Sequence, residues 1–155
     1  MQALLPSDLE VALAEGPEPA SAPRRAVTLI EAAGAADAAR LEAARESRAT
    51  ELRRALLVAS GVAPFLAKFF LRYPGALLDL VEDDLQRPRS LADYRERLDA
   101  ALGAAGEEEE ADTLRRFKYA ELARITVRDC FDDLVPEDRV GEVLGELSSL
   151  AESLL

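Results

Sequence analysis

Apolar residues recur at helical spacing along most of this chain, and no segment shows sustained alternation of apolar and polar residues. The predicted helices span about 24–33, 36–59, 65–71, 76–81, 91–101 and 114–129, and a last helix begins near Pro136. Gly34 is expected to end the first, Pro64 to lie in the first turn of the third, and Ser90 to cap the fifth. We therefore expect an all-α helical bundle of about five to seven helices.

The first 23 residues have a different pattern, because four prolines and four acidic residues interrupt them. The prolines are Pro6, Pro17, Pro19 and Pro23. Residues 16–23 are typical of a low-complexity linker. We expect a flexible, disordered, Pro-rich acidic leader over 1–23 and one helical domain over 24–155; docking of Leu9, Val11 and Leu13 on a core is the alternative.

The helix predicted over 114–129 carries the chain's only local concentration of positive charge. Its charges do not segregate, since Glu121, Arg124 and Arg128 share the side of the helix that holds Phe117 and its apolar neighbours. Arginines held against a packed surface need a carboxylate or an anion as partner.

Two interpretations of these arginines remain. Arg124 and Arg128 are four residues apart and repel each other; Glu121 can neutralise one of them, and the other needs a carboxylate from elsewhere or a phosphate. A structural ion-pair network is the commoner outcome, and the wall of a binding site is the alternative. The candidate anion or ion-pair contacts are Arg116, Glu121, Arg124 and Arg128.

Composition excludes several kinds of site. The chain has no histidine, which removes imidazole catalysis and His metal sites, and its one cysteine, Cys130, allows neither an internal disulfide nor a Cys-based zinc site. We expect Cys130 to be a buried structural thiol. The acidic clusters Glu82–Asp84 and Asp132–Asp133 are interpreted as solvated turns, so no catalytic, cofactor or metal-binding residue is predicted.

Charge and hydropathy restrict the partners. A net charge of -11 argues against binding to nucleic acid or to anionic membranes. No stretch approaches the roughly 20 apolar residues of a membrane span, and the N-terminus lacks the features of a signal peptide. We expect a cytoplasmic protein.

Three segments, in order, resemble a known family. They are Ser60–Leu66 continuing through Arg72-Tyr73-Pro74 to Leu77-Leu78, then Leu114–Asp129, and finally Leu147–Leu154. Together they are similar to the N-terminal portion of the bacterial bifunctional glutamine-synthetase adenylyltransferase, which adenylylates and deadenylylates glutamine synthetase. The resemblance covers roughly residues 50–155. Lys118-Tyr119 stands where the family most often has two arginines.

The resemblance implies a helical lead-in to a deadenylylating nucleotidyltransferase domain. Family members carry a Gly-rich loop and an Asp-x-Asp pair that holds Mg²⁺, and this chain has neither, so we expect no catalysis by the chain alone. The resemblance also implies Mg²⁺ and ATP for the parent enzyme, and the remainder of that enzyme, glutamine synthetase and the PII signal protein as partners. Arg124 and Arg128 would then point toward the catalytic domain.

The apolar end of the chain, Leu154-Leu155, leads us to expect a cut inside a longer protein; a docked terminal helix is the alternative. A different class of function also stays open. In that second hypothesis, the chain is a non-catalytic all-α protein-interaction module whose apolar end meets a partner.

Overall fold

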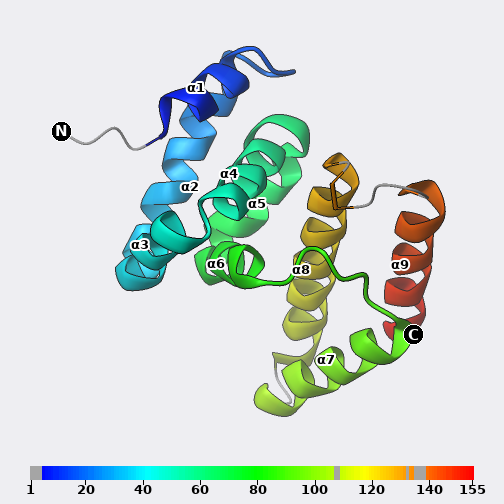
Figure 1. The fold of residues 1–155 in the computed structure, drawn as a ribbon. Coiled ribbons are helices and arrows are strands. Elements are labelled where there is room, and N and C mark those ends of the chain that lie inside the picture. Colours follow the sequence, from blue (N-terminus) through cyan, green and yellow to red (C-terminus); the bar gives the residue numbers. More distant parts are fainter. Residues whose placement is uncertain (1–4, 107–108, 132, 135–138) are drawn as a thin grey trace. The chain divides into compact units, whose positions relative to one another are not determined.

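The computed structural model describes residues 5–106, 109–131, 133–134 and 139–155. Within these ranges the chain forms nine α-helices and one π-helical turn, with no strand, so the all-α prediction is confirmed and the helix count lies slightly above the expected range (Figure 1). The chain divides into two compact units, where one domain over 24–155 was expected. Unit 1 ends at Asp83 and unit 2 begins at Asp84.

Unit 1 is arranged around one central helix, α2. Its elements are α1 (Ser7–Ala14), α2 (Ala22–Ala36), α3 (Ala38–Ser47), α4 (Ala49–Leu57), the π-turn η1 (Val58–Val62), α5 (Pro64–Arg72) and α6 (Pro74–Glu82). Helix α2 contacts every other element of the unit. Its buried residues recur every three or four positions, from Ala22 to Ala33, which gives the helix one continuous apolar face.

Helix α1 corrects the expectation of a flexible leader. Leu5, Leu9 and Leu13 follow one another at four-residue spacing and are buried, and α1 packs against α2 and α4. Arg25 of α2 forms an ion pair with Glu18, which fastens the turn between the two helices. Pro6, Pro17 and Pro19 flank the helices, and Pro23 lies in the first turn of α2, so the prolines do not prevent docking. Residues 1–4 lie outside the described part.

Two helix ends differ from the predictions for local reasons. Gly34 lies inside α2, and a Cβ there would approach Leu41 Cδ2 to 3.3 Å, so this glycine permits close packing of α3 and does not end a helix. Asp37 separates α2 from α3, with extended backbone (φ -157°, ψ 91°), and its carboxylate caps α3 by accepting from Arg40 N at 3.1 Å. Arg48 (φ -131°, ψ 34°) breaks the expected 36–59 helix again.

Helix α5 is less completely buried than its composition indicated. Pro64 begins it as expected, but Phe65 and Leu71 are exposed, while the opposite face, which includes Leu66 and Phe70, is buried. The helix is therefore amphipathic and covers one side of its unit. No single helix among the described residues is long and apolar enough to span a membrane; one bent pair, Ala49–Val62 with Pro64–Arg72, meets the length and composition criteria together.

Unit 2 consists of three helices: α7 (Leu91–Ala104), α8 (Glu110–Cys130) and α9 (Arg139–Ser153). Its apolar core is formed by residues of all three helices. The buried members are Tyr94, Leu98, Phe117, Ile125 and Leu150. Ser90 caps α7 as predicted, although the helix continues past Gly103 to Ala104. Pro136, expected to open the last helix, lies outside the described residues.

Candidate functional site

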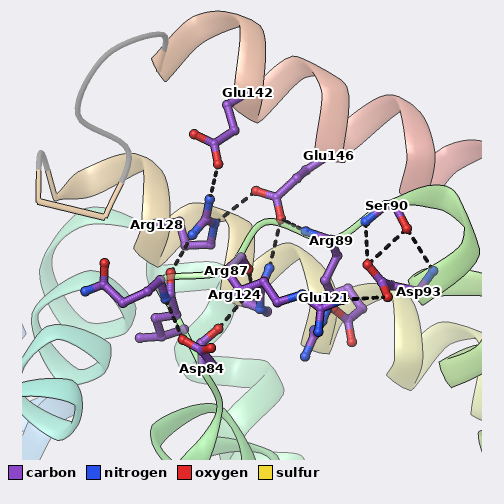
Figure 2. Close-up of polar contacts among 12 residues, drawn as sticks. Asp84, Arg87, Arg89, Ser90, Asp93, Glu121, Arg124, Arg128, Glu142 and Glu146 are labelled. Atoms are coloured by element: carbon purple, nitrogen blue, oxygen red, sulfur yellow. Dashed lines mark hydrogen bonds and ion pairs between the residues drawn. The ribbon is translucent and has the colours of Figure 1, made fainter.

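The site is built around the two arginines that α8 holds on its buried face. Arg124 and Arg128 have side chains only 2% and 0% exposed. Glu146 of α9 lies between them, with Oε1 at 2.9 Å from an Arg124 terminal nitrogen and Oε2 at 3.0 Å from Arg128 Nε (Figure 2). Glu142 Oε1 accepts from a terminal nitrogen of Arg128 at 2.7 Å. The carboxylates thus offset the repulsion between neighbouring arginines.

Matched spacing explains this pairing. The two acids are four residues apart on α9, and the two arginines are four residues apart on α8, so each pair lies on one face of its helix. The recurrence of this interval in two helices with opposite charge is the sequence signal that could have indicated the partners of the arginines, although it was not used to predict them.

The same arginines bind backbone groups of residues 84–89, which we call the connecting segment. Arg124 donates to two of its carbonyl oxygens and Arg128 to a third; the acceptors are the carbonyls of Asp84, Arg87 and Leu85. In the other direction, Arg89 N donates to Glu146 Oε1 at 2.9 Å. The segment is not helical, and side chains from α8 and α9 supply these hydrogen bonds.

Glu121, which the sequence placed beside Arg124, binds two further arginines. Its carboxylate forms a buried ion pair with Arg89 and accepts from Arg97 Nε at 3.1 Å. We refer to the linked set of charged side chains as the arginine network. Its members are Arg89, Arg97, Arg124, Arg128, Glu121, Glu142 and Glu146.

Tyr94 lies next to this network with its side chain fully buried. Burial raises the pKa of its phenol well above the ordinary value, and the nearby carboxylates of Glu146 and then Glu121 raise that pKa further. Its hydroxyl is buried and has no hydrogen-bond partner within the described part of the chain.

Two sequence-predicted residues lie away from the network. The side chain of Arg116 is 45% exposed, with Asp112 at 4.0 Å on its own helix. Cys130 is exposed, which corrects the expectation of a buried thiol. It is the last residue of α8, and the next residue, Phe131, already has extended backbone (φ -129°, ψ 118°). A wheel position predicts burial only where the helix continues along its packing partner.

The side chains of the network determine which ligands it can bind. Each oxygen of the buried carboxylates Glu121 and Glu146 accepts from a guanidinium group. Oxygens occupied in this way do not fit a divalent cation, which needs several converging free oxygen ligands. Within the described ranges, no group of three or more His, Cys, Asp or Glu could hold a metal ion. The carboxylates of the network bind its arginines, and the arginines bind backbone carbonyls.

Comparison with known proteins identifies a family. A family model described as glutamate-ammonia ligase adenylyltransferase matches residues 52–155, which is well over half of the chain and includes all of unit 2. The matched range agrees with the resemblance in the sequence over roughly residues 50–155. Neither the curated proteins nor the solved structures include a significant match.

Proposed function

Because the chain belongs to the glutamate-ammonia ligase adenylyltransferase family, we propose that it forms a helical scaffold of an enzyme that adds AMP to, or removes AMP from, glutamate-ammonia ligase (glutamine synthetase). The observation that carries the scaffold role is the buried arginine network, in which α8, α9 and the connecting segment are joined by charged side chains. Because every oxygen of Glu121 and Glu146 accepts from a guanidinium group, these carboxylates are poorly suited to bind a substrate, and we assign them the role of aligning the helices.

The chemistry itself is proposed to lie outside these residues. Nucleotidyl transfer needs carboxylates that hold metal ions near the phosphates. The buried carboxylates of this chain are engaged by arginines, and we route no catalytic step through them. A catalytic domain that uses Mg²⁺ and ATP, with PII protein and glutamine synthetase as partners, would complete the enzyme.

A direct assay tests whether the chain by itself lacks catalytic activity. The purified 155-residue chain is incubated with labelled ATP, Mg²⁺ and glutamine synthetase, and separately with adenylylated glutamine synthetase and phosphate. We expect no transfer of label and no release of AMP or ADP above the blank, whereas a family member known to be active gives both. Turnover by the chain alone overturns the proposal.

A second assay tests the role of the arginines in the complete enzyme. Arg124→Leu and Arg128→Leu are compared with Arg116→Leu, the exposed arginine of the same helix. If the network is scaffolding, both activities fall in proportion to the folded fraction, and the matched control is unaffected. Loss of deadenylylation at full stability would instead place the arginines at the active site.

One observation favours a second candidate function, a protein-interaction module. Val140 and Leu144 are 69% and 56% exposed and lie one turn apart on α9. Under this hypothesis the chain alone binds glutamine synthetase or PII protein in a titration, and Val140→Ser with Leu144→Ser weakens binding at least tenfold. Absence of binding by the chain at high micromolar concentration removes this candidate.

A further inference from the structure

We propose that the connecting segment, residues 84–89, is a detachable strap: it is fastened to unit 2 by the arginine network and can leave as one piece while α7, α8 and α9 stay packed. This inference concerns the chain itself and does not depend on the proposed function. Asp84 is the first residue of unit 2, so the segment forms the N-terminal end of unit 2 and follows directly after unit 1 in the sequence.

The hydrogen bonds of the segment show why it depends on side chains. Three of its carbonyl oxygens accept from Arg124 and Arg128, and the Arg89 N–H donates to Glu146. Within the segment, the Gln86 N–H donates to Asp84 Oδ1 at 3.0 Å. In helices and sheets these bonds would come from neighbouring backbone and would not respond to a single side chain.

Glu146 has a special position among the fastening groups. Its carboxylate orients both arginines that bind the carbonyls, and it also accepts from the Arg89 N–H. The hydrogen bonds to the segment's backbone therefore depend largely on one carboxylate, while the Arg89 side chain is held separately by its buried ion pair with Glu121. Bonds that share a single group are lost together, so the segment is expected to detach cooperatively.

The helices do not need the segment for their own integrity. The start of α7 is closed by a capping box in which Ser90 N donates to Asp93 Oδ2 at 2.8 Å and Asp93 N donates to Ser90 Oγ at 3.2 Å. The core cluster that contains Tyr94, Ile125 and Leu150 consists of helical residues. The one apolar anchor of the segment is Leu85, which is 4% exposed. Release therefore exposes one buried leucine and separates the Arg89 side chain from Glu121, while the helical core persists.

Release would change the length of free chain between the two units. The six residues of the segment can span up to about 20 Å when extended. Fastened, this length is held against unit 2; detached, it is added to the link between the units. The strap thus sets how far the link can reach without any change in the helices.

Native-state hydrogen exchange of the unmodified chain tests the proposal first. The Arg89 amide should exchange slowly. The free energy of the opening reaction that exposes it should vary little at low concentrations of denaturant, because detachment of the segment exposes little surface. Amides in the middle of α8, such as Ala123, should open only with the strong denaturant dependence of global unfolding. If the Arg89 amide is unprotected, or shares the denaturant dependence of α8, the proposal is wrong.

Substitution of Glu146 is the second test. In Glu146→Gln the Arg89 amide should exchange at least about tenfold faster, equivalent to ~1.4 kcal/mol, and trypsin should cut after Arg89 at a correspondingly higher rate. The α8 amides should change less than the Arg89 amide. The matched control is Glu152→Gln on the same helix, whose carboxylate meets Arg95 at 3.6 Å on the surface. Equal acceleration in α8 and in the segment would show that no separate detached state exists; if the variant does not fold, the exchange of the unmodified chain decides.

Discussion

At the scale of single residues, the buried hydroxyl of Tyr94 lies in an energetically unfavourable environment. Its hydroxyl is buried beside two carboxylates and lacks a hydrogen-bond partner among the described residues. A buried hydroxyl without a partner is costly. Ionising it would be costlier still, because burial disfavours the charged phenolate and because the phenolate would lie near the negative charges of Glu146 and Glu121. The fold therefore depends on this phenol keeping its proton.

This dependence predicts an alkaline loss of stability. In the unfolded chain Tyr94 ionises near the ordinary pKa of about 10, whereas its pKa in the folded chain is higher. The unfolded state therefore releases its proton first, and the free energy of unfolding falls as pH rises above about 10. Tyr94→Phe should remain within about 1 kcal/mol of the parent at neutral pH and should lose less stability at alkaline pH. Urea unfolding at pH 7 and pH 10.5 measures both.

The control for that experiment is Tyr119→Phe on α8, which leaves Tyr94 in place and should keep the full alkaline loss. An unchanged alkaline slope in Tyr94→Phe would contradict the assignment to Tyr94. Arg124 and Arg128 are buried on the side of α8 where the helical wheel placed them, whereas Arg116, which the sequence grouped with them, is 45% exposed. The carboxylates they meet were not identified in advance, since a wheel describes one helix and the partners Glu142 and Glu146 come from another.

At the scale of helices, α7 begins at a capping box formed by Ser90 and Asp93. Ser90 and Asp93 are three residues apart, and each side chain accepts from the backbone N–H of the other. The backbone bond from Ser90, then the bond from its hydroxyl, lowers the pKa of the Asp93 carboxyl. A cap of this kind satisfies N–H groups that have no partner in the first helical turn.

Replacing this cap should have a measurable cost. Ser90→Ala should lower the free energy of unfolding of unit 2 by about 1 kcal/mol at pH 7. Because the Asp93 pKa is lowered in the folded chain, its contribution is present above the ordinary value near 3.8 and is lost as pH falls below it; the variant should show a weaker loss in acid. Chemical denaturation at pH 7 and pH 3 gives both values.

The matched control is Ser47→Ala at the end of α3, where the hydroxyl donates to the Ala43 carbonyl on an exposed surface. It should change stability by less than about 0.5 kcal/mol. An equal effect of the two substitutions would remove the special role of the capping box.

Local signals at other helix ends were less decisive. Pro64 and Ser90 mark helix starts correctly, because their effects arise from the backbone of the residue itself. The π-turn after α4 and the break at Arg48 have no comparable signal, since the packing of neighbouring helices produces them. Helix α1 was missed for the same reason: eight residues do not form a stable helix alone, and α1 is stabilised by the surface it covers.

At the scale of the whole molecule, the chain divides into two compact units. Nothing at the junction distinguishes it from other acidic turns: Glu82-Asp83-Asp84 contains no glycine or proline. The arginine network and the apolar core of unit 2 both consist of residues from Asp84 onward. Unit 2 therefore contains a core and a polar network of its own.

We expect a polypeptide of residues 84–155 to fold without unit 1. It should be predominantly helical by circular dichroism and should unfold cooperatively in urea. A polypeptide of residues 90–155 is the informative comparison, because it keeps the α7 cap and lacks the carbonyls that Arg124 and Arg128 bind; it should be clearly less stable. A non-cooperative transition in the 84–155 polypeptide would contradict the autonomy of this unit.

The equal intervals of opposite charge on α8 and α9 also fix the axial register of these two helices. Sliding α9 by one residue would separate the acids from the guanidinium groups, and the next arrangement that could restore a contact lies a full turn away, about 5.4 Å along the axis. That displacement would bring only one acid opposite an arginine and would leave the other guanidinium unneutralised in the interior. Changes in the length of chain joining α8 to α9 should consequently be tolerated, whereas a single inserted residue between Glu142 and Glu146 should not.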